Sequence, residues 1–208
     1  RLSASEVAYI VEHSGASMLL VDPELEESLS HVSAAHRYVI GAESDALLYD
    51  FDNTPRGWSV PDEDATATIN YTSGTTARPM GVQLTHRNIW INESTFGWQT
   101  GVSDRDVLLH TLPMFHCNGW GMPYAVTGMG GEHIVLRKVD GAEILRRVAE
   151  HGVTLLCGAP AVVSAVLEAA ASWDGPIPGN GTTRIVVAGA APPTRTIERV
   201  ETELGWEF

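Results

Sequence analysis

Hydrophobic residues along the chain follow two patterns, one with helical spacing and one of short continuous runs. Near the start, apolar positions recur every three or four residues between Ser5, a residue type that caps helices, and Gly15, a residue type that ends them. Runs such as Val153–Cys157 and Ile185–Ala188 are apolar at nearly every position, which is typical of strands with both faces covered. The chain is therefore predicted to alternate between amphipathic helices and buried strands.

This alternation predicts the α/β class, with largely parallel sheets flanked by helices. Helices are expected at residues 5–14, 23–35, 86–98, 120–129, 141–151, 160–172 and 193–204. Strands are expected at residues 18–21, 38–40, 67–71, 107–112, 133–137, 153–157 and 184–188, with a further strand starting within 205–208. Residues 42–64 are polar and rich in Asp, Pro and Gly, and are predicted to be an acidic loop or linker.

The charge balance excludes some classes of partner. The chain has 26 acidic and 13 basic residues, for a net charge of −13, and Lys138 is the only lysine. Nucleic acids and anionic membrane surfaces are bound through clustered Lys and Arg, so neither is expected as a partner. The acidic excess is concentrated in residues 1–70, where we expect a solvated face.

Cysteine usage and hydropathy bear on the setting of the protein. Cys117 and Cys157 lie 40 residues apart without a CxxC pattern, so neither a disulfide framework nor a zinc ribbon is expected. No run reaches the roughly 18 apolar residues of a membrane helix, and no signal peptide opens the sequence. A cytoplasmic protein without an integral membrane segment is predicted. Because the chain starts at Arg1 and ends at Phe208 within a strand-like segment, we also expect it to be a piece of a longer protein.

The segment Tyr71–Val82 is the richest in candidate chemistry, and it follows a predicted strand. It contains five consecutive hydroxyl or glycine residues, which are Thr72, Ser73, Gly74, Thr75 and Thr76. Such a loop can surround phosphate oxygens with hydroxyl and backbone N–H donors. The spacing is not that of a Walker A loop, because Pro79 stands where the second glycine would be. From composition alone, a flexible turn rich in Ser and Thr is equally compatible.

This segment resembles the phosphate-binding signature of the adenylate-forming superfamily, [Tyr/Phe]-Thr-Ser/Thr-Gly-Thr-Thr-Gly-x-Pro-Lys-Gly-Val. Nine of the eleven specified positions agree, and Thr85–Asn88 after it also resembles the family. The resemblance implies that Thr72 is a Mg²⁺ ligand and that residues 73–76 bind the β- and γ-phosphates of ATP. It also implies that residues 1–208 are part of a large N-terminal, AMP-binding domain, without the C-terminal lid domain.

A second segment, Leu112–Tyr124, resembles medium- and long-chain fatty-acyl-CoA synthetases. The resemblance implies that His116 is a catalytic residue bordering the acyl site, and that Trp120 lines or gates a fatty-acyl tunnel. The residues are compatible with this, since an aromatic side chain flanked by glycines can swing. Taken alone, His116 would be interpreted as a hydrogen-bonded core histidine, and Trp120 as an ordinary core residue.

A third segment, Val187–Pro193, resembles the small-residue loop that contacts adenine in the same superfamily. The resemblance implies that Gly189, Ala190 and Ala191 flank the adenine ring, and small residues allow a flat ring to lie against the backbone. As sequence alone, the segment is a strand–turn–helix junction with a proline in the first turn of the helix.

Two positions of the phosphate signature depart from the family pattern. Ala77 stands where the family has glycine, and Met80 stands where it has lysine. A lysine there would place a point charge on the terminal phosphates, and methionine offers none. We therefore expect weaker binding of the ATP triphosphate than in a lysine-bearing relative. Whether Arg78 compensates is left open.

Together, the resemblances imply a fatty-acid–CoA ligase that uses ATP, Mg²⁺ and CoA. It would form acyl-AMP and pyrophosphate from a carboxylic acid and ATP, and then acyl-CoA and AMP. Residues 1–208 alone are expected to be inactive. Three alternatives remain: a degenerate, non-catalytic nucleotide or acyl binder, a purely structural fragment, and a ligase that transfers the acyl group to a carrier protein. Homodimer formation is left open.

Overall fold

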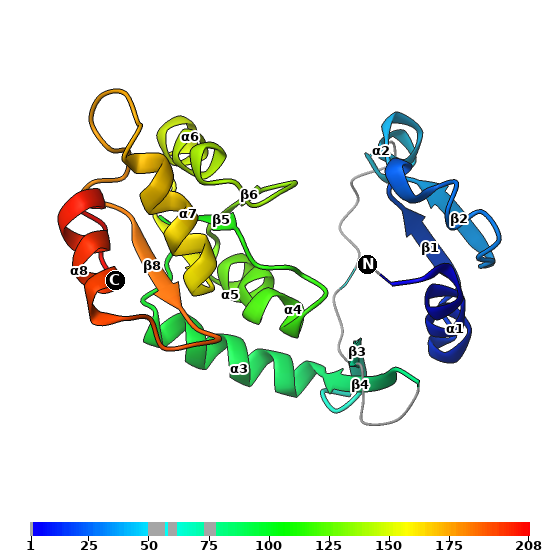
Figure 1. The fold of residues 1–208 in the computed structure, drawn as a ribbon. Coiled ribbons are helices and arrows are strands. Elements are labelled where there is room, and N and C mark those ends of the chain that lie inside the picture. Colours follow the sequence, from blue (N-terminus) through cyan, green and yellow to red (C-terminus); the bar gives the residue numbers. More distant parts are fainter. Residues whose placement is uncertain (1, 50–56, 58–61, 73–77) are drawn as a thin grey trace. The chain divides into compact units, whose positions relative to one another are not determined.

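Two units with separate hydrophobic cores make up the chain, residues 1–86 and residues 87–208 (Figure 1). The computed structural model describes residues 2–49, 57, 62–72 and 78–208. Both units combine helices with strands, so the α/β class predicted from the hydrophobic pattern is confirmed. None of the helices in the described ranges is long and apolar enough to cross a bilayer.

The first unit contains a parallel pair of strands, a helix before it and an antiparallel hairpin. Its elements are α1 (Ala4–Ser14), β1 (Met18–Val21), η1 (Pro23–Leu25), β2 (His36–Val39), α2 (Ala42–Tyr49), β3 (Thr66–Thr72) and β4 (Met80–Thr85). Strand β1 pairs in parallel with β2, so that Met18 lies opposite His36. The small core is formed by Val11, Val21, Leu29 and Val32, with α1 packed against it.

Helix α1 begins slightly earlier than the sequence predicted. Its N-cap is Ser3, not Ser5, because Ser3 and Glu6 form a capping box. The Ser3 hydroxyl accepts from the Glu6 backbone N–H at 3.3 Å, and the Glu6 carboxylate accepts from the Ser3 N–H at 2.7 Å. These bonds lower the pKa of Glu6. Gly15 ends the helix at φ 68°, as predicted.

Two other sequence predictions for the first unit are wrong. The segment from Pro23 to Ala35, expected to be a helix, is a single 3₁₀ turn followed by other turns, and in it the Ser28 hydroxyl bonds locally to the Leu25 carbonyl at 3.0 Å, a bond that competes with regular helix. Conversely, the first eight residues of the expected 42–64 loop form α2, where Ser44 accepts from the Gly41 N–H at 2.9 Å.

Strand β4 was not predicted, because glycine and proline at its start suggested a loop. It pairs antiparallel with β3, with Thr72 opposite Met80 and Tyr71 opposite Gly81. A Cβ on Gly81 would lie 3.0 Å from the Ile69 Cγ2 and 3.2 Å from the Tyr71 ring. A side chain at Gly81, a glycine of the phosphate signature, would therefore crowd two side chains of β3, and this glycine lies in a strand and not in a turn.

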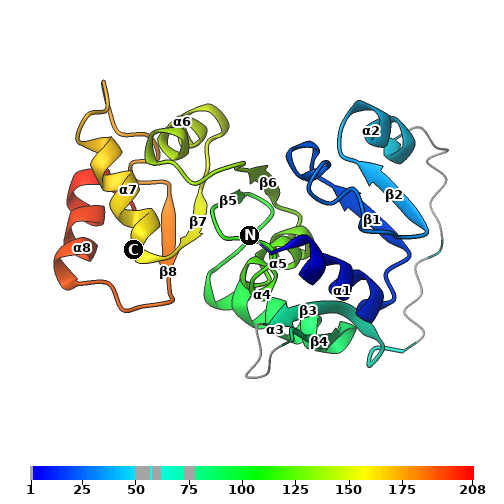
Figure 2. The same cartoon turned by 45° about the vertical axis from the view of Figure 1, so that its right-hand side comes forward.

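The second unit is built on a four-stranded parallel sheet with the order β6-β5-β7-β8 (Figure 2). Its helices are α3 (His86–Gln99), α4 (Cys117–Trp120), α5 (Met122–Met129), α6 (Gly141–His151), α7 (Pro160–Ala170) and α8 (Thr194–Arg199), which continues as η2 (Val200–Leu204). Its strands are β5 (Val107–His110), β6 (Glu132–Val135), β7 (Leu155–Gly158) and β8 (Arg184–Val187). The predicted parallel sheet is thus confirmed here, where every neighbouring pair is parallel.

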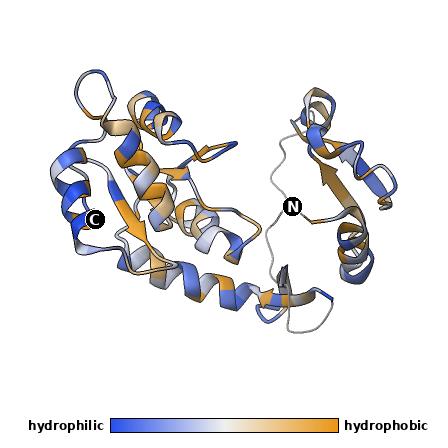
Figure 3. Ribbon diagram, in the orientation of Figure 1, coloured by the Kyte–Doolittle hydropathy of each residue, from blue (hydrophilic) through white to orange (hydrophobic). Residues whose placement is uncertain are grey.

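Helices α6, α7 and η2 share the larger core of the second unit with β5, β7 and β8. Figure 3 shows the apolar colour concentrated along β8 and the polar colour along α8. Trp206 closes this core, since it is 1% exposed and its indole N–H donates to the Pro178 carbonyl at 2.8 Å. The expected strand start after Gly205 is present as a parallel bridge between Arg184 and Glu207.

A buried ion pair joins the amino ends of three strands of the sheet. Asp106, just before β5, accepts from Arg184 of β8 at 2.8 Å and from the Thr154 hydroxyl, just before β7, at 2.7 Å. Burial alone would raise the pKa of Asp106, but these bonds and one from the Ser103 N–H more than offset it, so the pKa is lowered. The ionised carboxylate therefore stabilises the fold at neutral pH, and this stabilisation is lost as pH falls through the lowered pKa.

Replacing one partner of this pair should destabilise the protein. In Arg184→Met, the charge of Asp106, which is 6% exposed, stays buried without its partner, and we expect a loss of about 3 kcal/mol in the free energy of unfolding. Urea denaturation at pH 7 measures it. Arg146→Met is the control, because Arg146 forms only exposed ion pairs, and its loss should stay below about 0.5 kcal/mol. Equal losses in both variants would contradict the prediction.

A second polar contact links β5 and β6 to α5 through two histidines. The Thr127 hydroxyl donates to the Pro123 carbonyl at 2.6 Å, so it must accept from the His133 Nε2–H at 3.0 Å. His133 Nδ1 then accepts from the His110 Nε2–H at 2.9 Å. Both rings are neutral in this arrangement. Burial and the neighbouring His133 lower the pKa of His110 to about 4, and burial lowers that of His133.

Because of the histidine pair, the free energy of unfolding should depend on pH even above the pH range in which carboxylates titrate. Between the ordinary pKa of 6.5 and about 4, the unfolded chain binds more protons than the folded one, so the free energy of unfolding should fall as pH falls. Urea denaturation at pH 7, 6 and 5 should show a smaller fall in His110→Gln than in the parent protein. His36→Gln, at an exposed position, should leave the decrease in the free energy of unfolding as large as in the parent protein. If His110→Gln shows the same decrease as the parent protein, the prediction is wrong.

Candidate functional site

The two ends of the predicted phosphate loop meet in the β3–β4 hairpin. Thr72, the candidate Mg²⁺ ligand, is the exposed last residue of β3, and Met80 opposite it is 53% exposed. The predicted phosphate-binding residues Ser73, Gly74, Thr75 and Thr76, and the variant position Ala77, lie outside the described residues. The hairpin register thus brings the candidate metal ligand and the altered lysine position together at one end of a sheet.

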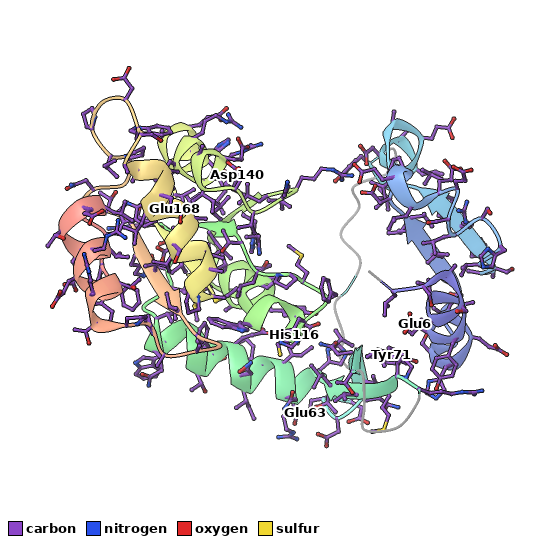
Figure 4. All side chains as sticks on the ribbon, in the orientation of Figure 1. Glu6, Glu63, Tyr71, His116, Asp140 and Glu168 are labelled. Carbon is purple, nitrogen blue, oxygen red and sulfur yellow. The ribbon has the colours of Figure 1, made fainter. Side chains whose placement is uncertain are left out.

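Two side chains of α1 support this hairpin. His13 Nδ1 lies 2.8 Å from the Tyr71 hydroxyl, and the Tyr9 hydroxyl donates to the Pro79 carbonyl at 3.4 Å. The guanidinium of Arg78 lies 5.6 Å from the centre of the Tyr9 ring, within cation–π range. Sequence reasoning missed Tyr9 and His13, because their partners lie about 60 to 70 residues away along the chain. Tyr71 is labelled in Figure 4.

The predicted acyl segment leaves the carboxyl end of β5. The Thr111 hydroxyl donates to the Cys157 carbonyl of β7 and anchors the segment. His116 follows as the exposed N-cap of α4 and is labelled in Figure 4. Trp120, at the end of α4, is partly buried and packs against the core cluster that includes Met122 and Val126. His116 is thus not a core histidine, whereas Trp120 contacts the core with part of its side chain.

The backbone of this segment is left-handed over five consecutive residues. From Cys117 to Gly121 every φ lies between 49° and 70°, although a continuous helix start at 120 was expected. Glycine tolerates this conformation, but Cys117, Asn118 and Trp120 are disfavoured by about 1–2 kcal/mol each. The turn is held by the Gly119 N–H, which donates to the His116 carbonyl at 3.0 Å. Strained backbone of this kind is found at functional sites.

Helix α3 borders the left-handed turn with two polar side chains. A Cβ on Gly121 would lie 3.4 Å from the Asn92 Nδ2 and 3.6 Å from the Glu93 Cγ. Burial raises the pKa of Glu93 to about 7, and burial together with the Glu93 charge raises the pKa of Tyr124. Sequence reasoning missed Glu93, because a single acid in a mixed helix carries no distinguishing pattern.

The predicted adenine loop follows the carboxyl end of β8. The Ala188 N–H donates to the Gly158 carbonyl of β7 at 3.2 Å, and Gly189, Ala190 and Ala191 beyond it are exposed. Gly189 has a φ of 92°, which only glycine adopts readily, although a Cβ there would meet no other atom within 4 Å. The loop therefore leaves an open backbone surface above the sheet.

The parallel sheet brings the acyl segment and the adenine loop to the same edge. Since β5 and β8 are parallel and separated only by β7, their carboxyl ends face the same way, about 10 Å apart at the usual strand spacing. Ligands of open α/β sheets bind at this edge. The phosphate loop belongs to the first unit. The sheet thus brings two of the three predicted segments, the acyl segment and the adenine loop, to one edge.

The two cysteines take no part in a disulfide. Cys117 is exposed in the left-handed turn, and Cys157 is buried in β7, where burial raises the pKa of its thiol to about 12. Cys157 is therefore an inert core residue, while Cys117 lies beside the candidate acyl residues.

Comparisons with known proteins find CoA ligases among the chains that this sequence is similar to. The chain is 33% identical to acetate–CoA ligase CCL3 of Humulus lupulus and 35% identical to the acetate/butyrate–CoA ligase AAE7 of Arabidopsis thaliana, described as peroxisomal. Each alignment covers 93% of this chain and 39% of the relative, so the chain spans about two fifths of the length of these relatives.

The fold is also found in a solved structure. The N-terminal domain of FACL13 from Mycobacterium tuberculosis superposes with a TM-score of 0.82 at 21% identity, over 99% of this chain and 52% of that one. The sequence model of the family described as AMP-binding enzyme matches residues 1–207, which is nearly the whole chain. The chain therefore belongs to the AMP-binding enzyme family, of which it represents part of the N-terminal region.

Proposed function

We propose that the protein is an ATP-dependent, AMP-forming ligase that activates a carboxylic acid and transfers its acyl group to CoA. The observation that carries the proposal is the common edge of the parallel sheet, from which both the acyl segment and the adenine loop extend. Membership of the AMP-binding family and the CoA ligases among the relatives support it.

The proposed reaction has two steps. A carboxylate oxygen attacks the α-phosphorus of ATP, and pyrophosphate leaves as acyl-AMP forms. The thiol of CoA then loses its proton, its sulfur attacks the acyl carbon, and AMP leaves. Little covalent chemistry falls to the protein, so catalysis depends on positioning and on neutralising phosphate charge. Mg²⁺ would neutralise part of that charge when bound.

We assign the binding roles as follows. Thr72 fits a Mg²⁺ site because its hydroxyl is exposed at the end of β3, and Mg²⁺ takes only one or two protein ligands beside phosphates and water. Residues 73–76 bind the β- and γ-phosphates. Gly189, Ala190 and Ala191 contact adenine through their exposed backbone. His116 and Trp120 border the acyl group, and His116 is the candidate catalytic side chain.

For the acid we propose an aliphatic, fatty-acid type substrate. The partly buried, apolar Trp120 beside the exposed turn supports this choice. The names of the two relatives given above specify acetate and butyrate for those proteins. The cytoplasm is our proposed location, and CoA is preferred to a carrier protein as acceptor because the relatives are CoA ligases.

ATP–pyrophosphate exchange tests the proposed activity. With the full-length protein, we expect exchange that depends on an added acid, in a series from acetate to palmitate that also defines the chain length. Acyl-CoA formation with CoA, but not with a carrier protein, is expected in the second step. Nucleotide binding without exchange for any acid would instead favour the non-catalytic binder.

The altered lysine position gives a second test. Met80→Lys restores a cation at the end of the phosphate loop, so we expect ATP to bind about tenfold more tightly, or about 1.4 kcal/mol. Titration calorimetry with MgATP measures this, and AMP, which lacks the terminal phosphates, should show little change. Met80→Leu adds no charge and serves as the matched control. Equal ATP affinities in the Lys and Leu variants would show that this position does not contact the triphosphate.

A further inference from the structure

Glu93 lies on the side of α3 that faces α5. Gly97, one helical turn later on the same row, is buried, and a Cβ there would lie 3.5 Å from the Met129 Cε and 4.0 Å from the Ala125 Cβ. Other positions of α3 face solvent, where Trp98 is 85% exposed. An acid on the packed row is unusual, because burying a carboxylate without a partner costs free energy.

The side chain of Glu93 approaches the turn that carries the candidate acyl residues. Its Cγ lies 3.6 Å from the place of a Cβ on Gly121, the residue after Trp120. Tyr124, one turn further along α5, is near enough for the Glu93 charge to raise the pKa of its phenol. Glu93 is thus an ionisable group beside the turn that carries His116 and Trp120.

No hydrogen bond or ion pair to the Glu93 carboxyl is found in the described part of the chain. Desolvation raises its pKa to about 7, so at neutral pH the group is protonated in about half of the molecules. A carboxyl group that is half-buried, without a partner and able both to donate and to accept can satisfy its bonds with a ligand. Groups of this kind are typical of binding sites.

We propose that Glu93 is a specificity-determining residue of the acyl site, where its carboxyl group hydrogen-bonds a hydroxyl group of the carboxylic acid substrate. The inference rests on the proposed function and adds the class of acid, a hydroxylated one. A site built to bond a hydroxyl rejects an analogue that lacks it, because its own polar group is then left unpaired. The acyl site is therefore selective for a hydroxy acid and not for acid length alone.

Paired substrates test this directly. The full-length protein is assayed by ATP–pyrophosphate exchange with 3-hydroxybutyrate and with butyrate, which differ only by the hydroxyl group. We expect kcat/KM to favour 3-hydroxybutyrate by at least about tenfold. Glu93→Leu should remove this preference by raising kcat/KM for butyrate relative to the hydroxy acid. Glu93→Gln keeps a donor and an acceptor and should retain most of it.

Controls separate the inference from its premise. Glu168→Leu makes the same change at an exposed position of α7 and should leave the ratio of the two acids unchanged. If Glu93→Leu does not fold, Glu93→Met, which has a similar length and no hydrogen-bonding group, decides in its place. The role of Glu93 is overturned if the kcat/KM ratio of 3-hydroxybutyrate to butyrate is unchanged in the folded variant. It is also overturned if kcat/KM falls equally for both acids. Absence of exchange with every acid in the parent protein overturns the proposed function itself.

Discussion

The contact of Asp106 with Thr154 and Arg184 is the constraint on which the candidate site depends. It joins the amino ends of β5, β7 and β8 with hydrogen bonds of 2.7 and 2.8 Å, and the Thr154 hydroxyl also accepts from the Val107 N–H at 3.0 Å. In a parallel sheet, a register fixed at one edge fixes the other edge too. The contact therefore determines where the acyl segment and the adenine loop begin, although it lies at the opposite end of the strands.

At this edge of the sheet, the turn at residues 117–121 adopts a left-handed backbone conformation that its non-glycine residues disfavour. The strain of its non-glycine residues is offset by the α5 residues that follow, since Met122 and Val126 are at most 1% exposed in the core. Trp120 packs on the same core, so its position is coupled to the turn. A change in the turn would consequently move Trp120 and the backbone beside Glu93 together.

Much of the fold could be predicted from sequence, because buried parallel strands are continuous apolar runs. The strands β7 and β8 could be predicted without their partners, whereas β4 could not, because Gly81 belongs to a strand through its pairing with Tyr71 of β3. The helix expected after Pro23 failed for a different, local reason, because its apolar spacing is helical while the Ser28 hydroxyl bonds to the nearby Leu25 carbonyl. Local propensity decides such segments only where no tertiary contact overrides it.

The candidate site divides in the same way. His116, Trp120 and residues 189–191 were identified by motif, and the structure gives them their common edge. Glu93 could not be found by motif or periodicity, because its distinction is a contact with Gly121 across two helices. The handedness of the turn was likewise invisible, since neither Cys117 nor Trp120 belongs to the residue types that prefer positive φ.

The hairpin gives the departure at Met80 a physical meaning that the sequence alone lacked. Because Met80 pairs with Thr72, its side chain position is fixed by the strand register and not by the loop between them. Arg78, the nearest cation in sequence, lies over the Tyr9 ring, so using it on a phosphate would require breaking that contact. Under the proposed function, the triphosphate would therefore be bound by hydroxyl and backbone N–H donors, because Met80 carries no charge and Lys138 is the only lysine of the sequence.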